Sequence, residues 1–147
     1  MTQTPGSAPL TVRRVIPAAR ERVFDAWLDP ARLARFMVPG GEGHAVADVD
    51  PRVGGGFRIV MHHPTSGSGG VEHTGEYLLI DRPNRLVFTW RSTHTDNRDT
   101  RVTVDFHDRG DATEVVLTHE QLPARTVESH RNGWATILDH LEQLMVR

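Results

Sequence analysis

The sequence has 147 residues, a length that predicts one ordinary domain and leaves no room for a second catalytic one. It contains no cysteine, which excludes disulfide bridges, zinc-thiolate sites and a cysteine nucleophile. Its 17 basic residues are all arginines scattered along the chain, and 19 acidic residues bring the formal charge to −2, so no surface for nucleic acid is expected.

No stretch of the sequence approaches the roughly 20 apolar residues that span a bilayer. The first ten residues, MTQTPGSAPL, also lack the charged and then apolar segments of a signal peptide. We therefore expect a cytoplasmic protein that binds no membrane.

The chain begins with a polar segment and then turns to regular structure. Met1–Pro9 is rich in Thr, Pro, Gly and Ser, which predicts a disordered tail. Leu10–Ile16 has the pattern of a strand, which Pro17 ends. Ala19–Leu28 has apolar residues at helical spacing and predicts a helix. A second short helix is predicted at about Pro30–Phe36, because proline is tolerated at the first helical position.

Six further segments alternate apolar and polar residues in the manner of half-buried strands. The connections between them are short, so neighbours in sequence should pair as an antiparallel meander. With the first strand they predict a seven-stranded sheet. The six segments are His44–Asp50, Gly56–His63, Val71–Asp81, Arg85–Thr95, Arg101–Asp108 and Ala112–Gln121.

The last segment, Arg125–Arg147, changes to the period of a helix. Its apolar stripe predicts an amphipathic helix laid against a core. Gly133 lies inside this helix, where it either lets a strand backbone or a ligand come close or is simply tolerated. The elements together predict the α+β class and a single domain over residues 10–147. The stripe consists of His130, Trp134, Ile137, Leu138, Leu141 and Met145.

Several runs of residues connect this element order with a known family. They are Arg22–Pro30, Asp48–Phe57, Gly75–Trp90, Thr113–His119 and the pair Gly133-Trp134. The chain resembles the family named for the activator of the heat-shock-protein-90 ATPase, within the START-like superfamily, which is also called birch-pollen-allergen-like. The resemblance covers nearly everything from Leu10 onward.

This resemblance implies a helix-grip fold with a deep cavity between the sheet and the long helix. In that fold a curved seven-stranded antiparallel sheet wraps around the long C-terminal helix, and two short helices follow the first strand. The resemblance implies no fixed reaction, because members of the group serve as carriers, cyclases, hydrolases or co-chaperone modules on one scaffold.

Strand alternation assigns side chains to the cavity, because residues i and i+2 point to the same face. Tyr77 and Leu79 are expected on the inner face, with Tyr77 opposite Phe88. That register places Gly75 opposite Trp90, where the missing side chain makes room for the indole, and Trp90 should stack on a ligand. The residues expected to bind the ligand are Trp27, Phe36, Met37, Phe57, Ile59, Met61, Tyr77, Phe88, Trp90, His94, Val104, His119, Trp134, Leu138 and Leu141.

Nine histidines raise the question of a metal site. By the same register, His62 and His63 could converge with His73 and His94 at one end of the sheet, but their spacing matches no known ligand pattern. The glycine-rich turns open no helix and lack the Lys-Ser/Thr of a phosphate loop, and no Gly-x-Ser-x-Gly elbow is present. We therefore expect neither a metal nor a cofactor.

Three classes of function remain. A non-catalytic binder of a small apolar or aromatic molecule leads, because the sequence supplies a cavity without a convincing nucleophile, base or metal. The second is a cavity enzyme of the cyclase, dehydratase or hydrolase type, with His119 or His94 as general acid-base and Tyr77 as hydrogen-bond donor. The third is a co-chaperone-like or stress-response interaction module, which would have a protein partner or form a homodimer.

Overall fold

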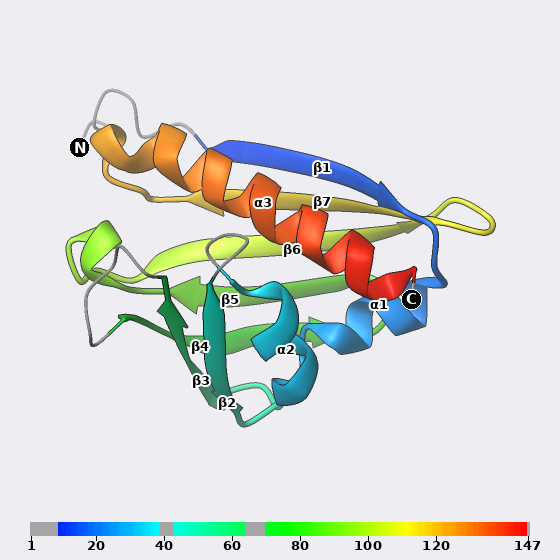
Figure 1. The fold of residues 1–147 in the computed structure, drawn as a ribbon, viewed down its shortest axis with the longest axis horizontal. Helices are drawn as coiled ribbons and strands as arrows, with labels where there is room; N and C mark the ends of the chain where they lie inside the picture. The colour runs from blue at the N-terminus through cyan, green and yellow to red at the C-terminus, as the bar shows by residue number, and fades with distance from the viewer. Residues whose placement is uncertain (1–8, 39–42, 64–69, 147) are drawn as a thin grey trace.

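The computed structural model describes residues 9–38, 43–63 and 70–146. The predicted disordered tail, apart from Pro9, lies outside the described residues. Within these ranges the strands and helices follow the predicted order (Figure 1). The elements are β1 (Leu10–Ile16), α1 (Arg20–Ala26), α2 (Pro30–Phe36), β2 (His44–Val49), β3 (Gly56–His62), β4 (Val71–Asp81), β5 (Arg85–Trp90), the 3₁₀ helix η1 (Thr93–Thr95), β6 (Thr100–Asp108), β7 (Thr113–Glu120), the 3₁₀ helix η2 (Ala124–Thr126) and α3 (Val127–Met145).

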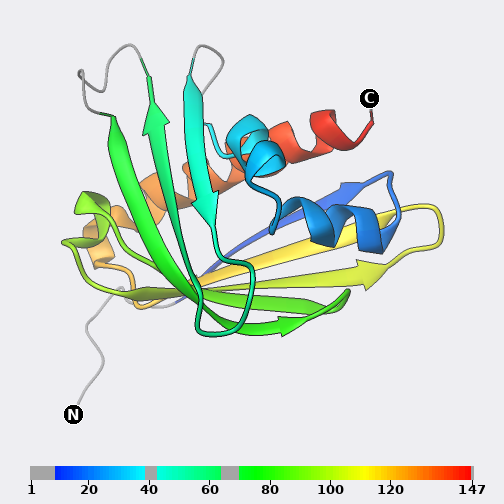
Figure 2. The same ribbon diagram turned by 90° about the horizontal axis from the view of Figure 1, so that it is seen from below.

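The seven strands form one antiparallel sheet in the order β1-β7-β6-β5-β4-β3-β2. Figure 2 shows the sheet curling, so that β2, β3 and β4 rise at a steep angle to β6 and β7. The helix α3 packs along β1, and α2 packs against β2, so both edge strands have a helix beside them. This arrangement confirms the predicted helix-grip fold.

Local sequence explains where α2 begins and which face of α3 is buried. The side chain of Asp29 accepts a hydrogen bond from the Ala31 amide (3.0 Å), and Pro30 occupies the first turn, so α2 starts with a capped end. The stripe predicted in α3 is buried from Trp134 to Met145. Burial of this stripe against the sheet, rather than helix propensity, holds α3 in place.

Two local features differ from the alternation expected along β4 and β5. A β-bulge follows Tyr77, which pairs with Phe88, whereas Leu79 pairs with Val87. The extra residue turns both Leu78 and Leu79 outward, with exposed fractions of 42% and 40%. The prediction that Leu79 shares the inner face with Tyr77 is therefore wrong.

The strand predicted at Arg85–Thr95 ends at Trp90. Ser92 and Thr95 form a capping box, in which each side chain accepts a hydrogen bond from a backbone amide of the turn (3.0 and 3.1 Å). The chain then passes through left-handed backbone at Asp96, with φ of 58°. His94 consequently lies on η1 and not on the alternation of β5.

Gly75 is required by close packing between strands. Tyr77 pairs with Phe88 and Thr74 bridges Arg91, so the predicted register of β4 and β5 is confirmed. A Cβ atom on Gly75 would lie 2.0 Å from the carbonyl oxygen of Thr89 and 2.4 Å from Cζ of Phe57. The missing side chain therefore makes room for the ring of Phe57 on β3, and not for the indole of Trp90 as expected.

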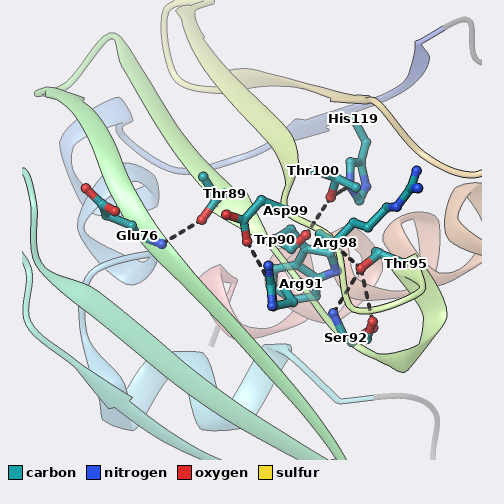
Figure 3. A network of polar contacts seen from close by, with 10 residues as sticks. All are labelled: Glu76, Thr89, Trp90, Arg91, Ser92, Thr95, Arg98, Asp99, Thr100 and His119. Atoms are coloured by element: carbon teal, nitrogen blue, oxygen red, sulfur yellow. Dashed lines mark hydrogen bonds and ion pairs between the residues drawn. The ribbon is translucent and has the colours of Figure 1, made fainter.

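A chain of hydrogen bonds inside the core links α3 to the sheet. The indole Nε1–H of Trp134 donates to Nδ1 of His119 (2.9 Å). His119 Nε2 lies 2.7 Å from Oγ1 of Thr100, which lies 2.6 Å from the carbonyl oxygen of Trp90 (Figure 3). An indole only donates, so His119 Nδ1 is the acceptor. Nε2 then carries the proton and donates to Thr100, whose hydroxyl donates to Trp90.

His119 is neutral in this chain of hydrogen bonds. Its side chain is fully buried. Burial, with a smaller contribution from the charge of His130, lowers the pKa of His119 to about 3. Protonation at Nδ1 would also remove the acceptor that Trp134 needs. The neutral form is thus the one that holds the helix to the sheet.

Gly75→Ala should destabilise the fold, because the new methyl group would overlap backbone of β5. We expect a loss of about 1 to 3 kcal/mol in the free energy of unfolding, measured by urea denaturation. Gly133→Ala is the matched control, since its Cβ would meet no atom within 4 Å and alanine favours a helix by up to about 1 kcal/mol. Equal stability of the two variants would contradict the close approach at Gly75.

The free energy of unfolding should also fall as the pH is lowered from 7 to 5. Unfolded His119 takes up a proton below its ordinary pKa of about 6.5, whereas folded His119 does so only near pH 3, so protons favour the unfolded chain across this window. For one histidine with these two pKa values, the loss amounts to about 2 kcal/mol.

Other buried histidines add to this slope, so a variant isolates the part that belongs to His119. His119→Gln keeps a donor and an acceptor but does not titrate. It should flatten the stability profile between pH 7 and pH 5 by about 2 kcal/mol, measured from urea midpoints. If wild type and variant show the same pH dependence, His119 is not neutral in the folded protein.

Candidate functional site

An open cavity of about 440 Å³ lies between one end of the sheet and the N-terminal half of α3. Strands β3, β4 and β5 supply one wall, η1 contributes to it, and α3 supplies the opposite wall. The cavity combines apolar side chains with imidazoles. Its lining residues are Met61, His63, Val71, His73, Trp90, His94, Ser129, His130, Gly133, Trp134 and Ile137.

Two indoles form a continuous apolar surface in this cavity. The ring centroids of Trp90 and Trp134 lie 5.0 Å apart at an interplanar angle of 52°. The imidazole of His73 lies 4.8 Å from Trp90. Both indoles are only 2 to 3% exposed, so the core packs against most of each ring and a small part of it is accessible from the cavity. The two rings are held rigidly at the cavity wall, where they offer a ligand an aromatic contact.

Four histidines line the same cavity. Of the four histidines that could converge by the predicted register, His63, His73 and His94 line this cavity, and His130 of α3 joins them. His62 does not line it and stacks on His44 with ring centroids 4.5 Å apart. Burial lowers the pKa of His73 to about 4, and the charge of His94 contributes. Burial also lowers the pKa of His130. His73 and His130 are thus neutral imidazoles at pH 7.

The individual imidazoles differ in how their nitrogen atoms are satisfied. Nδ1 of His130 lies 2.9 Å from the carbonyl oxygen of Thr126, one turn earlier in the chain. Nδ1 of His73 is buried and makes no hydrogen bond with the protein. Within residues 9–38, 43–63 and 70–146, no three His, Asp or Glu side chains are placed to hold a metal ion together.

The centre of the sheet, whose aromatic side chains were expected to line the cavity, is nearly filled. The space among the aromatic side chains there is only about 10 Å³, roughly the room of one water molecule. Phe57 and Phe88 meet edge to face with centroids 5.4 Å apart, and Trp27 covers Phe88 at 6.5 Å. Side chains from α1 and α2 therefore fill this end of the sheet at core density.

The expected binding residues fall into three groups. Met61, Trp90, His94 and Trp134 line the open cavity. Trp27, Met37, Phe57, Ile59, Tyr77 and Phe88 surround the small central void, which Trp90 also borders. Phe36, Val104, His119, Leu138 and Leu141 are core residues that line neither space.

His119 lies away from the cavity for a chemical reason. Both of its ring nitrogens are engaged inside the core, by Trp134 and by Thr100. It positions the two indoles but has no free atom for a ligand. Trp90 in turn both lines the cavity and packs against the core, so its ring is not reserved for a ligand.

Several residues that line the cavity were not predicted from the sequence as binding residues. Val71, Ser129 and Ile137 gave no functional signal, although Ile137 belongs to the helix stripe. His130 and Gly133 did give one, since His130 is the polar member of the inward stripe and Gly133 is a glycine inside a helix. A Cβ atom on Gly133 would meet no atom within 4 Å, so the glycine leaves open space beside the indoles.

The fold also agrees with that of solved structures. Protein CV1439 from Chromobacterium violaceum is 27% identical, with a TM-score of 0.82 over 97% of this chain and 98% of that one. The AHSA1-like protein from Aeromonas hydrophila is 28% identical, with a TM-score of 0.77 over 92% and 90%. PFC0360w, an HSP90 activator from Plasmodium falciparum, is 26% identical, with a TM-score of 0.73 over 92% and 94%.

None of the helices in the described ranges is long and apolar enough to cross a membrane.

Among curated proteins, no match to the chain is found. Residues 17–146, however, match the family described as activator of Hsp90 ATPase homolog 1-like protein. The match extends from the end of β1 to the end of α3. The chain therefore belongs to the activator of Hsp90 ATPase homolog 1-like family.

Proposed function

We propose that this protein binds one small, planar, predominantly apolar molecule in the open cavity between the sheet and α3. The observation that carries the proposal is the cavity itself, about 440 Å³ in volume and walled by the indoles of Trp90 and Trp134. Cavities of about 300 to 1,000 Å³ with apolar walls and a few polar groups are typical of small-molecule sites.

The composition of the cavity wall favours an uncharged ligand. The described lining residues include no carboxylate and no arginine. The lowered pKa values of His73 and His130 leave these two imidazoles neutral at pH 7. A permanently charged molecule would lose its hydration without gaining a partner of opposite charge, which costs free energy. The absence of cysteine is compatible with binding in the cytoplasm.

A cavity enzyme is the second candidate, and one observation favours it. His73 and His130 face the same cavity from opposite walls, and neutral imidazoles with lowered pKa values can accept a proton. Of the groups expected from the sequence, His94 lines this cavity, whereas His119 and Tyr77 do not. A catalytic role would therefore belong to His73, His94 or His130.

A protein partner is a third candidate, favoured by the family. The related PFC0360w is described as an HSP90 activator. Leu78 and Leu79, turned outward by the bulge in β4, are apolar side chains that such a partner, or a second copy of the chain, could cover. The cavity does not depend on this interaction.

Gly133→Leu should abolish ligand binding without loss of stability. The new side chain enters open space beside Trp134, so it occupies the ligand's volume without a clash, and it replaces a residue that disfavours the helix. Titration of an environment-sensitive apolar dye should give one saturable site in wild type and none in the variant. Urea denaturation should show equal or greater stability.

Asn132→Leu is the matched control, because it adds the same side chain one position away, on an exposed residue outside the cavity lining. It should leave the dye affinity within about twofold of wild type. Dye binding that survives in Gly133→Leu would show that the cavity is not the site, and the partner-binding role would then be the better account.

A further inference from the structure

We infer that the ligand of this cavity carries a hydrogen-bond donor on its aromatic framework, a phenol-type hydroxyl, which it donates to Nε2 of His130. The inference deepens the proposed function and rests on it. It comes from the tautomer of His130, which a contact with the carbonyl of Thr126, the residue just before α3, fixes. The sequence contains no sign of this preference, because it depends on which ring nitrogen is already occupied.

The first step concerns Nδ1 of His130. This nitrogen lies 2.9 Å from the carbonyl oxygen of Thr126, and a carbonyl oxygen only accepts hydrogen bonds. Nδ1 must therefore carry the proton and donate it. Because Nδ1 turns toward the backbone of its own helix, Nε2 is the nitrogen farther from that backbone.

The second step concerns Nε2. A neutral imidazole has one N–H, so with the proton at Nδ1 the other nitrogen is an acceptor. Burial, opposed by the contact with Thr126 and assisted by the charge of His94, keeps the pKa of His130 below its ordinary value. His130 thus offers the cavity an acceptor at neutral pH, and a ligand with only acceptors would meet repulsion between lone pairs.

The neighbouring polar groups of the α3 wall also offer no free hydrogen-bond donor to a ligand. The hydroxyl of Ser129 donates to the Thr126 carbonyl (3.0 Å), which leaves its lone pairs free. The indole N–H of Trp134 is consumed by His119 (2.9 Å) and is not available to a ligand. The α3 wall therefore accepts hydrogen bonds beside an apolar surface, and a hydroxylated aromatic molecule matches both properties.

The test compares two ligands that differ in whether the same oxygen carries a hydrogen or a methyl group. 2-Naphthol and 2-methoxynaphthalene have the same ring system and an oxygen at the same place, but only the naphthol donates. Calorimetric titration at pH 7 should show 2-naphthol binding about fivefold more tightly, the usual contribution of one hydrogen bond. Equal or weaker binding of 2-naphthol would overturn the inference and leave the proposed function intact.

Two variants assign the preference to His130. His130→Phe keeps a planar ring without the acceptor and should bind both compounds equally. His130→Gln retains an amide oxygen that accepts and should keep part of the preference. Each variant's melting curve is recorded beforehand. A full preference for 2-naphthol in His130→Phe would overturn the inference, whereas no binding of either compound to wild-type protein would contradict the proposed function as well.

Discussion

The hydrogen-bond chain from Trp134 through His119 and Thr100 to the backbone of Trp90 determines how the rest of the molecule is arranged. It ties α3 to β7, β6 and β5 in turn, and it lies in the core, where a missing partner costs more than in water. Because each member can pair in only one way, the two indoles are held in a fixed relation. The boundary between the packed aromatic residues and the open cavity depends on how these two indoles are held.

Trp90 marks this boundary. On one side, Phe57 and Phe88 pack against it at centroid distances of 5.9 and 6.2 Å, and only about 10 Å³ remains open. On the other side lies the 440 Å³ cavity. The difference follows from what covers each end of the curved sheet. Trp27 after α1, Leu33 of α2 and Met37 after α2 fill one end, whereas Gly133 of α3 adds no side-chain volume at the other.

The fold was predictable from the sequence because its signals are local. Alternation, short connections and the change of period near Arg125 predicted the strands, the antiparallel order and the helix, and the pairing of Tyr77 with Phe88 followed from one turn. The position of the cavity was not predictable in this way. Alternation tells which side chains point inward, but whether they meet depends on volumes contributed by distant segments, as Phe57 beneath Gly75 demonstrates.

The role of His119 could not be predicted from the sequence for a related reason. The sequence places it on the inner face, which is correct, yet its chemistry depends on partners 15 and 19 residues away that take both ring nitrogens. In His130 only Nδ1 is engaged, by the carbonyl of Thr126 at the start of its helix, and Nε2 is left for the cavity. Two histidines on facing elements therefore have opposite roles, one structural and one available to a ligand, and only the hydrogen-bond partners distinguish them.

The two faces of the sheet also differ in charge, and this difference bears on what the protein binds. Cross-strand ion pairs join neighbouring strands on the outer face, among them Arg58 with Glu72 and Arg85 with Asp105. Exposed pairs of this kind contribute little stability each, but they keep that face hydrated. The cavity lining has no arginine or carboxylate among the described residues. A molecule that enters it therefore gains from stacking and single hydrogen bonds, which discriminate between ligands by shape and by the position of one proton.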